Sequence, residues 1–153
     1  MIIAMLLATT LALASFLFHF GVLRGLSGSL ASVPMTNSIR ILVIVLAILT
    51  AHLLQVVVYA IGFVVAVEFF SIGGFGGRGV ETHLDYLYFS IVSFTSLGLG
   101  DVYPLGHLRL LTGVEALNGL LLIAWSGSFI YTAMEWLWPW EPCAEPKGRK
   151  SDN

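Results

Sequence analysis

The stretch "SFTSLGLGDVYP", Ser93 to Pro104, decides the fold that we predict for this chain. Two glycines stand one residue apart, an aspartate follows them directly, and apolar sequence lies on both sides. Gly98 and Gly100 can adopt a positive φ, which strains residues that carry a β-carbon. A backbone with such residues at alternate positions can direct successive carbonyl groups toward one axis.

The composition of the chain predicts an all-α membrane protein. Of 153 residues, 58% are hydrophobic and 10% are charged, whereas soluble domains have about 25% charged residues. The formal net charge is -2 and the few basic residues are scattered. This distribution excludes the basic footprint of a protein that binds nucleic acid.

Three apolar segments are long enough to cross a bilayer, which takes about 20 residues. We expect an extra N-terminal transmembrane helix over residues 1–24, an outer helix over 39–70 and an inner helix over 106–138. No Lys or Arg precedes the first segment, so we expect it to be retained rather than cleaved as a signal peptide. A short polar tail, residues 139–153, completes the chain.

The basic residues predict the orientation of these helices. Arg24 and Arg40 flank the connection between the first two helices, and the positive-inside rule places that connection in the cytoplasm. The N-terminus is then outside and the C-terminal tail is cytoplasmic. Residues 71–81 become an external, glycine-rich loop, which we expect to be flexible and to give no scaffold for a site. Residues 82–104 start and end on the outer side, so the chain enters the membrane there and turns back.

This re-entrant segment begins with a short helix, which we predict over residues 83–95. Thr82 followed by Asp85 is typical of a capping box at a helix start. About 12 helical residues span roughly 18 Å, which is too short to cross the membrane. The negative end of the helix dipole therefore lies within the membrane, where it favours a cation. A ring of carbonyls from several copies of the following loop can replace the hydration shell of an ion.

The loop resembles the selectivity filter of tetrameric potassium channels, which reads T-V-G-Y-G-D, and it is similar to the G-L-G filters of two-pore-domain potassium channels. The resemblance implies a pore domain over residues 39–138, with a pore helix over 83–95 and a filter over 96–101. It implies K⁺ ions in the filter, no organic cofactor and no enzymatic activity. The expected filter residues are Thr95, Ser96, Leu97, Gly98, Leu99, Gly100 and Asp101, with Ser96, Leu97, Gly98 and Leu99 as the ligands of K⁺.

Three residues outside the loop are candidates for supporting the filter. Leu99 stands where the family has a tyrosine, so the phenol that braces the family's filter is absent. Glu115 is an ionisable residue in an apolar helix, where such groups face protein or water. We expect it to brace the filter or the pore helix, the alternative being a partner for Arg109 or water. Tyr88 and Phe89 form the pore-helix face toward the filter.

Two helices carry further patterned residues. By the resemblance, Gly119 falls near the glycine hinge of the inner helix, and four-residue spacing predicts a pore-lining stripe. Its members are Gly119, Ile123, Gly127, Tyr131 and Glu135. Small residues on the same helix equally suit close helix packing. On the outer helix, His52, Gln55 and Tyr59 predict interhelical hydrogen bonds, with pH sensing through His52 as the alternative.

Taken with the resemblance, these features predict a homotetrameric, potassium-preferring cation channel of a bacterial inner membrane. Each subunit has three transmembrane helices and one re-entrant loop. The expected partners are further copies of the chain, membrane lipid and an unseen regulatory subunit. Two alternatives stay open at this stage: a weakly selective cation channel, and a non-conducting or accessory membrane subunit.

Overall fold

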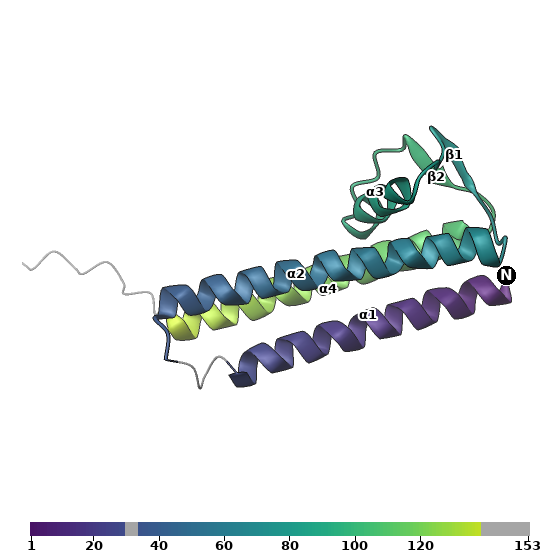
Figure 1. Cartoon of the computed structure of the whole chain (residues 1–153). Helices are drawn as coiled ribbons and strands as arrows, with labels where there is room; N and C mark the ends of the chain where they lie inside the picture. The colour runs from purple at the N-terminus through teal and green to yellow at the C-terminus, as the bar shows by residue number, and fades with distance from the viewer. Residues whose placement is uncertain (30–33, 139–153) are drawn as a thin grey trace, which may run out of the picture.

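The computed structural model describes residues 1–29 and 34–138, so the predicted tail over 139–153 lies outside the described residues. The described chain is mostly helical (Figure 1). Its elements, in chain order, are α1 (Ile2–Ser29), α2 (Asn37–Val64), the π-helical turn η1 (Val65–Phe69), β1 (Phe75–Gly77), α3 (His83–Phe94), β2 (Val102–Pro104) and α4 (Leu108–Leu137).

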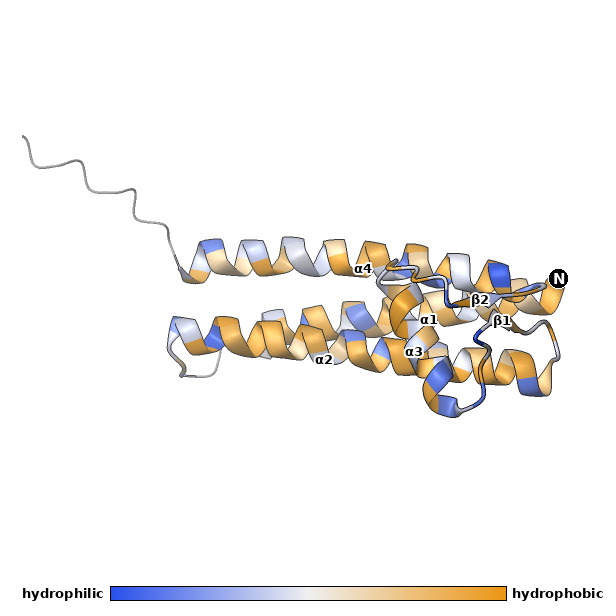
Figure 2. Cartoon of the chain, turned by 90° about the horizontal axis from the view of Figure 1, so that it is seen from above, coloured by the Kyte–Doolittle hydropathy of each residue, from blue (hydrophilic) through white to orange (hydrophobic). Residues whose placement is uncertain are grey.

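Three of the described helices are long and apolar enough to cross a membrane: α1, α4, and α2 together with η1. Figure 2 shows apolar residues along most of their length. The protein therefore has three candidate membrane-spanning helices, and the composition makes it an integral membrane protein. The observed helices differ from the predicted ranges only at their ends: α1 continues to Ser29, and the outer helix ends in a π-helical turn.

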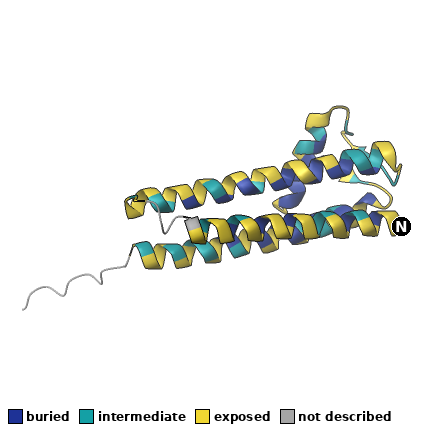
Figure 3. Cartoon of the chain, turned by 60° about the horizontal axis from the view of Figure 1, so that its bottom comes forward, coloured by how far each residue is buried: buried dark blue, intermediate teal, exposed yellow. Residues whose placement is uncertain are grey.

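The helices pack as a bundle with α2 and α4 at its centre. In Figure 1, α2 and α4 run side by side in opposite directions, with α1 on one side of the pair and α3 with the two strands on the other. Figure 3 shows buried residues on the facing sides of the helices and exposed residues on their outer faces. Large exposed side chains such as Leu6, Leu46 and Leu121 are apolar, which suits contact with lipid.

The main core lies where α3 packs on the long helices, near the N-terminal end of α1. Phe63 of α2 is fully buried and its ring meets the ring of Phe89 edge-on, with 5.1 Å between centroids. Phe75 of β1 adds a second edge-on contact to Phe89 at 4.7 Å. Edge-to-face pairs of this kind add to the free energy gained from burying the rings. The aromatic cluster therefore fixes α3 and β1 against α2.

Residues 71–81 are more ordered than the sequence predicted. β1 pairs antiparallel with β2, with Gly76 opposite Tyr103 and Gly77 opposite Val102. A β-carbon on Gly76 would meet the Tyr103 ring, and one on Gly77 would meet the carbonyl oxygen of Asp101. The glycines there permit close backbone approach, so part of the loop that was expected to be flexible forms a paired strand. The pairing ties residues 75–77 to the chain that follows Asp101.

The N-terminus of α3 is capped by Asp85. Its Oδ2 accepts hydrogen bonds from the backbone N–H groups of Thr82 (2.8 Å) and Glu81 (3.0 Å), and from the Thr82 hydroxyl (2.9 Å). These donors, the Thr82 N–H foremost, lower the pKa of the Asp85 carboxyl because they stabilise its charged form. The cap satisfies two N–H groups at the start of the helix.

At its other end, α3 approaches α4 through a glycine. A β-carbon on Gly119 would collide with the carbonyl oxygen of Phe94, the last residue of α3. Gly119 is buried, and its lack of a side chain sets how closely the end of α3 can lie to α4. The same residue was predicted as a hinge, and that role stays a prediction.

We predict that Gly119→Ala destabilises the protein by about 1–3 kcal/mol, the usual cost of overpacking, because backbone atoms must move to admit the methyl group. Gly113→Ala is the matched control, since a β-carbon at Gly113 meets nothing within 4 Å. Thermal unfolding in detergent should give a lower midpoint for Gly119→Ala and an unchanged or higher midpoint for Gly113→Ala. Equal midpoints would contradict the close approach of Phe94 to α4.

We also predict that the stability contributed by Asp85 depends on pH. Because the folded-state pKa lies below the ordinary value of 3.8, the contribution is present above that value and is lost as the pH falls through the lowered one. Asp85→Asn should therefore be less stable than the parent at neutral pH, with the difference vanishing in strong acid. Glu81→Gln is the control, and unfolding midpoints across a pH series are the measurement. A difference that persists in strong acid would rule out the charged cap.

Candidate functional site

The loop Thr95–Asp101 has an alternating backbone. The φ angles of Ser96, Gly98 and Gly100 are +57°, +56° and +80°, while Leu97 and Leu99 between them are not among the residues with positive φ. The two glycines are those expected from the sequence. Ser96 was not expected to be left-handed, and a non-glycine residue costs energy in that region. The alternation therefore extends one residue further toward α3 than the glycine pattern shows.

The N–H groups of the loop turn back onto the end of α3. Ser96 N donates to the carbonyl of Ser93 at 2.9 Å, and Leu97 N donates to that of Val92 at 2.9 Å. Alternation of left- and right-handed residues brings successive N–H groups to one side of the chain. These bonds satisfy the last carbonyls of α3, which a helix end otherwise leaves without donors. The helix terminus and the loop thus form one hydrogen-bonded unit.

The carbonyl groups of the loop, unlike its first N–H groups, lack hydrogen-bond partners. Within residues 1–29 and 34–138, no hydrogen bond ends on a carbonyl oxygen of Thr95–Gly100. Every residue from Thr95 to Asp101 is exposed in the single chain, with Leu97 at 62% and Leu99 at 59%. Backbone carbonyls without donors are costly in an apolar environment. They are therefore available to a cation, to water or to another copy of the chain.

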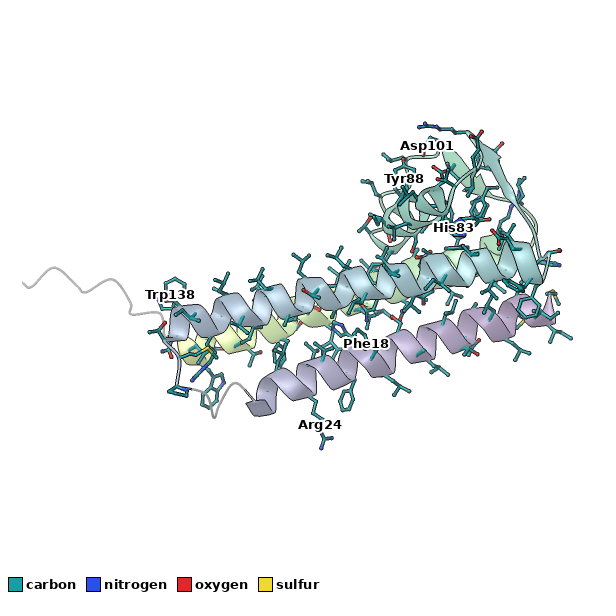
Figure 4. The ribbon with its side chains drawn as sticks, viewed as in Figure 1. Phe18, Arg24, His83, Tyr88, Asp101 and Trp138 are labelled. Carbon is teal, nitrogen blue, oxygen red and sulfur yellow. The ribbon has the colours of Figure 1, made fainter. Side chains whose placement is uncertain are left out.

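Asp101, at the end of the loop, is held from two sides. Its Oδ2 accepts a hydrogen bond from the Tyr88 hydroxyl at 2.9 Å, and its carbonyl accepts one from Arg78 N at 2.8 Å. Figure 4 shows Tyr88 of α3 and Asp101 on the same side of the molecule. The bond to Asp101 raises the pKa of the Tyr88 phenol, so the hydroxyl keeps its hydrogen and remains a donor. Tyr88 thus contacts the loop, whereas Phe89 lies in the aromatic core.

Glu115 contacts α3 rather than Arg109. It is fully buried on α4, and its Oε1 lies 2.5 Å from the Ser90 hydroxyl of α3. The same hydroxyl lies 2.9 Å from the carbonyl oxygen of Val56 on α2. Ser90 and Glu115 therefore link three helices behind the loop. Ser90 was not selected from the sequence, although a serine among apolar residues of a short membrane helix is a signal for such a contact.

The polar residues of α2 form interhelical hydrogen bonds, as predicted. His52 Nε2 lies 3.0 Å from Ser126 Oγ, and Gln55 Nε2 donates to the Ser15 carbonyl at 3.1 Å. The Tyr59 hydroxyl accepts from Asn118 Nδ2 at 3.1 Å. Ser126 and Asn118 were not selected from the sequence as bonding partners. Their polar character inside an apolar helix was the available signal.

The predicted stripe on α4 is not brought to the loop within one chain. Gly119 is buried against Phe94, while Ile123, Gly127, Tyr131 and Glu135 are exposed. Tyr131 is 70% exposed near the far end of the helix. Their role in lining a pore stays a prediction.

The chemistry available at the loop is that of backbone oxygen ligands. Among the described residues, no group of three His, Cys, Asp or Glu side chains could hold a metal ion. Carbonyl oxygens are hard ligands, and rings of them coordinate alkali cations in channel filters. The arrangement therefore suits reversible coordination of a weakly bound cation rather than a tightly held metal.

Comparison with known proteins gives one match. A family model described as ion channel matches residues 53–135, from the middle of α2 through α3 and the loop to the last turns of α4. The match covers more than half of the chain and leaves α1 outside. Searches of curated proteins and of solved structures give no match. On the strength of the family match, this chain belongs to the ion channel family.

Proposed function

We propose that the protein is a homotetrameric, potassium-preferring cation channel whose selectivity filter is the loop Thr95–Asp101. The observation that carries this proposal is the alternating backbone at Ser96, Gly98 and Gly100. The K⁺ ligands are the carbonyl oxygens of Ser96, Leu97, Gly98 and Leu99. The family match supports ion transport across a membrane and favours a protein without catalytic activity.

The hydrogen-bond pattern of the loop supports this assignment. The N–H groups of Ser96, Leu97 and Gly98 are bound to carbonyls at the end of α3, and among the described residues the carbonyl oxygens of Thr95–Gly100 accept no hydrogen bond. A permeating ion loses its hydration shell only where oxygen ligands replace it. The helix dipole of α3 places partial negative charge next to these ligands, which further favours a cation.

The need for several copies follows from the exposure of the loop. One chain offers carbonyls from one side only, so it cannot surround an ion. Leu97 and Leu99 are exposed beside a polar backbone, and polar backbone is not tolerated against lipid. A closed ring of chains resolves both problems, because it buries the loops and directs their carbonyls at a shared axis. Four copies is the number implied by the resemblance of the filter.

In this arrangement α3 is the pore helix and α4 is the inner helix. The exposed part of the predicted stripe, Ile123, Gly127, Tyr131 and Glu135, lines the cavity below the filter, while Gly119 packs against Phe94 at the top of it. The N-terminus and residues 70–107 lie at the same end of the molecule (Figure 1), and we place that end outside the cell. The C-terminal tail is then cytoplasmic, in what we propose is a bacterial inner membrane. Lipid contacts the outer faces of the helices.

The nearest alternative is a weakly selective cation channel. Leu99 has no hydroxyl with which to bond the surrounding helices, so its side chain can brace the filter only through apolar contacts made in the assembled ring. The Tyr88–Asp101 bond braces the outer end of the loop instead. We favour potassium preference because that brace, the Arg78 bond and the bonds onto α3 together hold the loop at both ends.

The experiment is to measure ion flux in liposomes containing the purified protein, under a gradient of K⁺ against Na⁺. We expect a reversal potential close to that of K⁺, and a complex of four chains by native mass spectrometry. Gly98→Ala should abolish the K⁺ current while leaving the tetramer intact, because the added β-carbon strains a residue with positive φ by about 1 kcal/mol or more.

Gly79→Ala is the matched control for that experiment. Gly79 has a φ of +81° and, like Gly98, no atom within 4 Å of the position that a β-carbon would take, but it lies outside the loop. Its variant should conduct like the parent. Normal K⁺ current in Gly98→Ala would refute the filter assignment, and a parent without current would favour a non-conducting or accessory subunit.

A second prediction concerns Leu99. Because Leu99 can make apolar contacts but no hydrogen bond, selectivity should depend on ion occupancy and weaken when external K⁺ is low. Leu99→Tyr should reduce that dependence if its hydroxyl finds a partner near Tyr88. The measurement is the Na⁺/K⁺ permeability ratio over a series of K⁺ concentrations, for parent and variant. A flat ratio in the parent would show that Leu99 does not loosen the filter.

A further inference from the structure

A chain of polar side chains crosses the centre of the bundle and connects three helices. Its members are the side chains of His19 on α1, His52 and Gln55 on α2 and Ser126 on α4, and it ends at the backbone carbonyl of Ser15 on α1. His19 is fully buried, and Gln55 and Ser126 are 1% and 3% exposed. The family match begins at residue 53, so Ser15, His19 and His52 lie outside it, and the proposed conduction mechanism uses none of the five residues.

The hydrogen bonds of this chain have a defined direction. Gln55 Nε2 donates to the Ser15 carbonyl at 3.1 Å, so Gln55 Oε1 is the atom that faces His52 Nδ1, at 3.0 Å. An amide oxygen only accepts, so His52 carries its hydrogen on Nδ1. With one hydrogen on the ring, His52 Nε2 accepts from the Ser126 hydroxyl at 3.0 Å.

Ser126 is the branch point of the chain. Having donated its single hydrogen to His52, its oxygen accepts from His19 Nε2 at 3.1 Å. One hydroxyl thus joins α1 to α2 through α4. The rings of His19 and His52 also stack, with centroids 5.1 Å apart. Removing this one oxygen leaves His52 Nε2 without its donor and His19 Nε2 without its acceptor in a buried site, which is unfavourable on both sides.

The chain ends next to the residue from which the filter starts. The His52 ring lies 5.8 Å, between centroids, from the ring of Phe94. Phe94 is 1% exposed, is the last residue of α3, and has its carbonyl against Gly119. A shift of His52 therefore acts on a side chain that has no free space around it, and Phe94 is followed directly by Thr95 and Ser96.

We propose that Ser126 is a positioning residue for the filter, and that through its bonds to His19 and His52 it lets α1 control the placement of Phe94. α1 packs mainly on α4 and α2, and this chain is the hydrogen-bonded route that leads from α1 toward Phe94. The inference rests on the proposed function for its effect on ion selectivity. The mechanical link from Ser126 to Phe94 does not depend on conduction.

The test compares two disruptive variants with two matched controls. Ser126→Ala removes the shared oxygen, and Ser128→Ala removes a hydroxyl from an exposed position two residues away. His19→Leu removes the donor to Ser126, and His19→Gln restores it, because the Gln amide nitrogen reaches about as far as His Nε2. The first readout is hydrogen exchange of the backbone amides from Val92 to Leu97 in the full-length protein.

We expect exchange at these amides to be several-fold faster in Ser126→Ala and His19→Leu, and unchanged in Ser128→Ala and His19→Gln. The second readout is the Na⁺/K⁺ permeability ratio in liposomes, which should rise in the same two variants and recover in His19→Gln. Unchanged exchange in Ser126→Ala overturns the proposal whether or not the protein conducts. Faster exchange with an unchanged permeability ratio in a conducting parent also overturns it, since the chain would then only stabilise the bundle.

A parent that fails to conduct contradicts the proposed function alone, and exchange then decides whether Ser126 positions Phe94. Trp125 offers an independent check that α1 has stayed docked in each variant. Its ring lies 5.7 Å from that of His19 and 5.3 Å from that of Phe16, between centroids. In Ser126→Ala, which leaves both of these rings in place, faster exchange at the end of α3 with an unchanged Trp125 environment supports a local link rather than loss of α1.

Discussion

A polar backbone surrounded by lipid has no water to bond, and most of this structure can be understood from that constraint. The three long helices meet it internally, because each N–H binds a carbonyl one turn away. The chain between Phe70 and Leu108 is not one continuous helix, so its backbone groups need other partners. Its solution has three parts: a short capped helix, a two-stranded pairing, and a loop whose first N–H groups return to the end of α3. What remains is a row of carbonyls without donors.

Those carbonyls are the reason for connecting the fold to ion transport. A soluble protein would hydrate such a loop, and nothing would follow from it. In a membrane protein of the ion channel family, oxygen atoms with no protein donor need an ion, water or a ring of neighbours. The bonds at Asp101, from Tyr88 and from Arg78, fasten the outer end of the loop to α3 and to the chain that follows β1. Residues outside the loop, Tyr88 and Arg78, therefore help to hold its conformation.

The buried polar residues show the same constraint acting on side chains. Glu115, Ser90, His19, Gln55 and Ser126 are all buried among apolar helices, and each has a partner on another helix. Such bonds contribute modestly to stability in membranes, about 0.6 kcal/mol on average. Their larger effect is on specificity, since a helix that rotates or slides leaves several polar groups without partners. The bundle therefore has one favoured register, and α1 is included in it.

The sequence by itself determined the parts of the protein that depend on local chemistry. Apolar length determined three spanning helices, Thr82 and Asp85 determined where α3 begins, and Gly98 with Gly100 determined which residues turn left-handed. Each of these follows from a residue's own backbone preference or from neighbours a few positions away. The polar spacing on α2 likewise indicated interhelical hydrogen bonds, because lipid offers no other partner.

Only the tertiary structure decided which distant groups meet. The pairing of β1 with β2 corrected the expectation of a flexible loop, because the glycines there admit Tyr103 and the Asp101 carbonyl, which lie more than 20 residues away along the chain. Ser96 adopts a positive φ because its N–H binds the end of α3, a reason that its own side chain does not supply. Gly119 was likewise placed by tertiary packing. The sequence predicted it as a hinge, and in the structure it lies against the carbonyl of Phe94. Contacts between helices depend on rotation about the helix axis, and apolar residues all around a membrane helix leave that rotation undetermined.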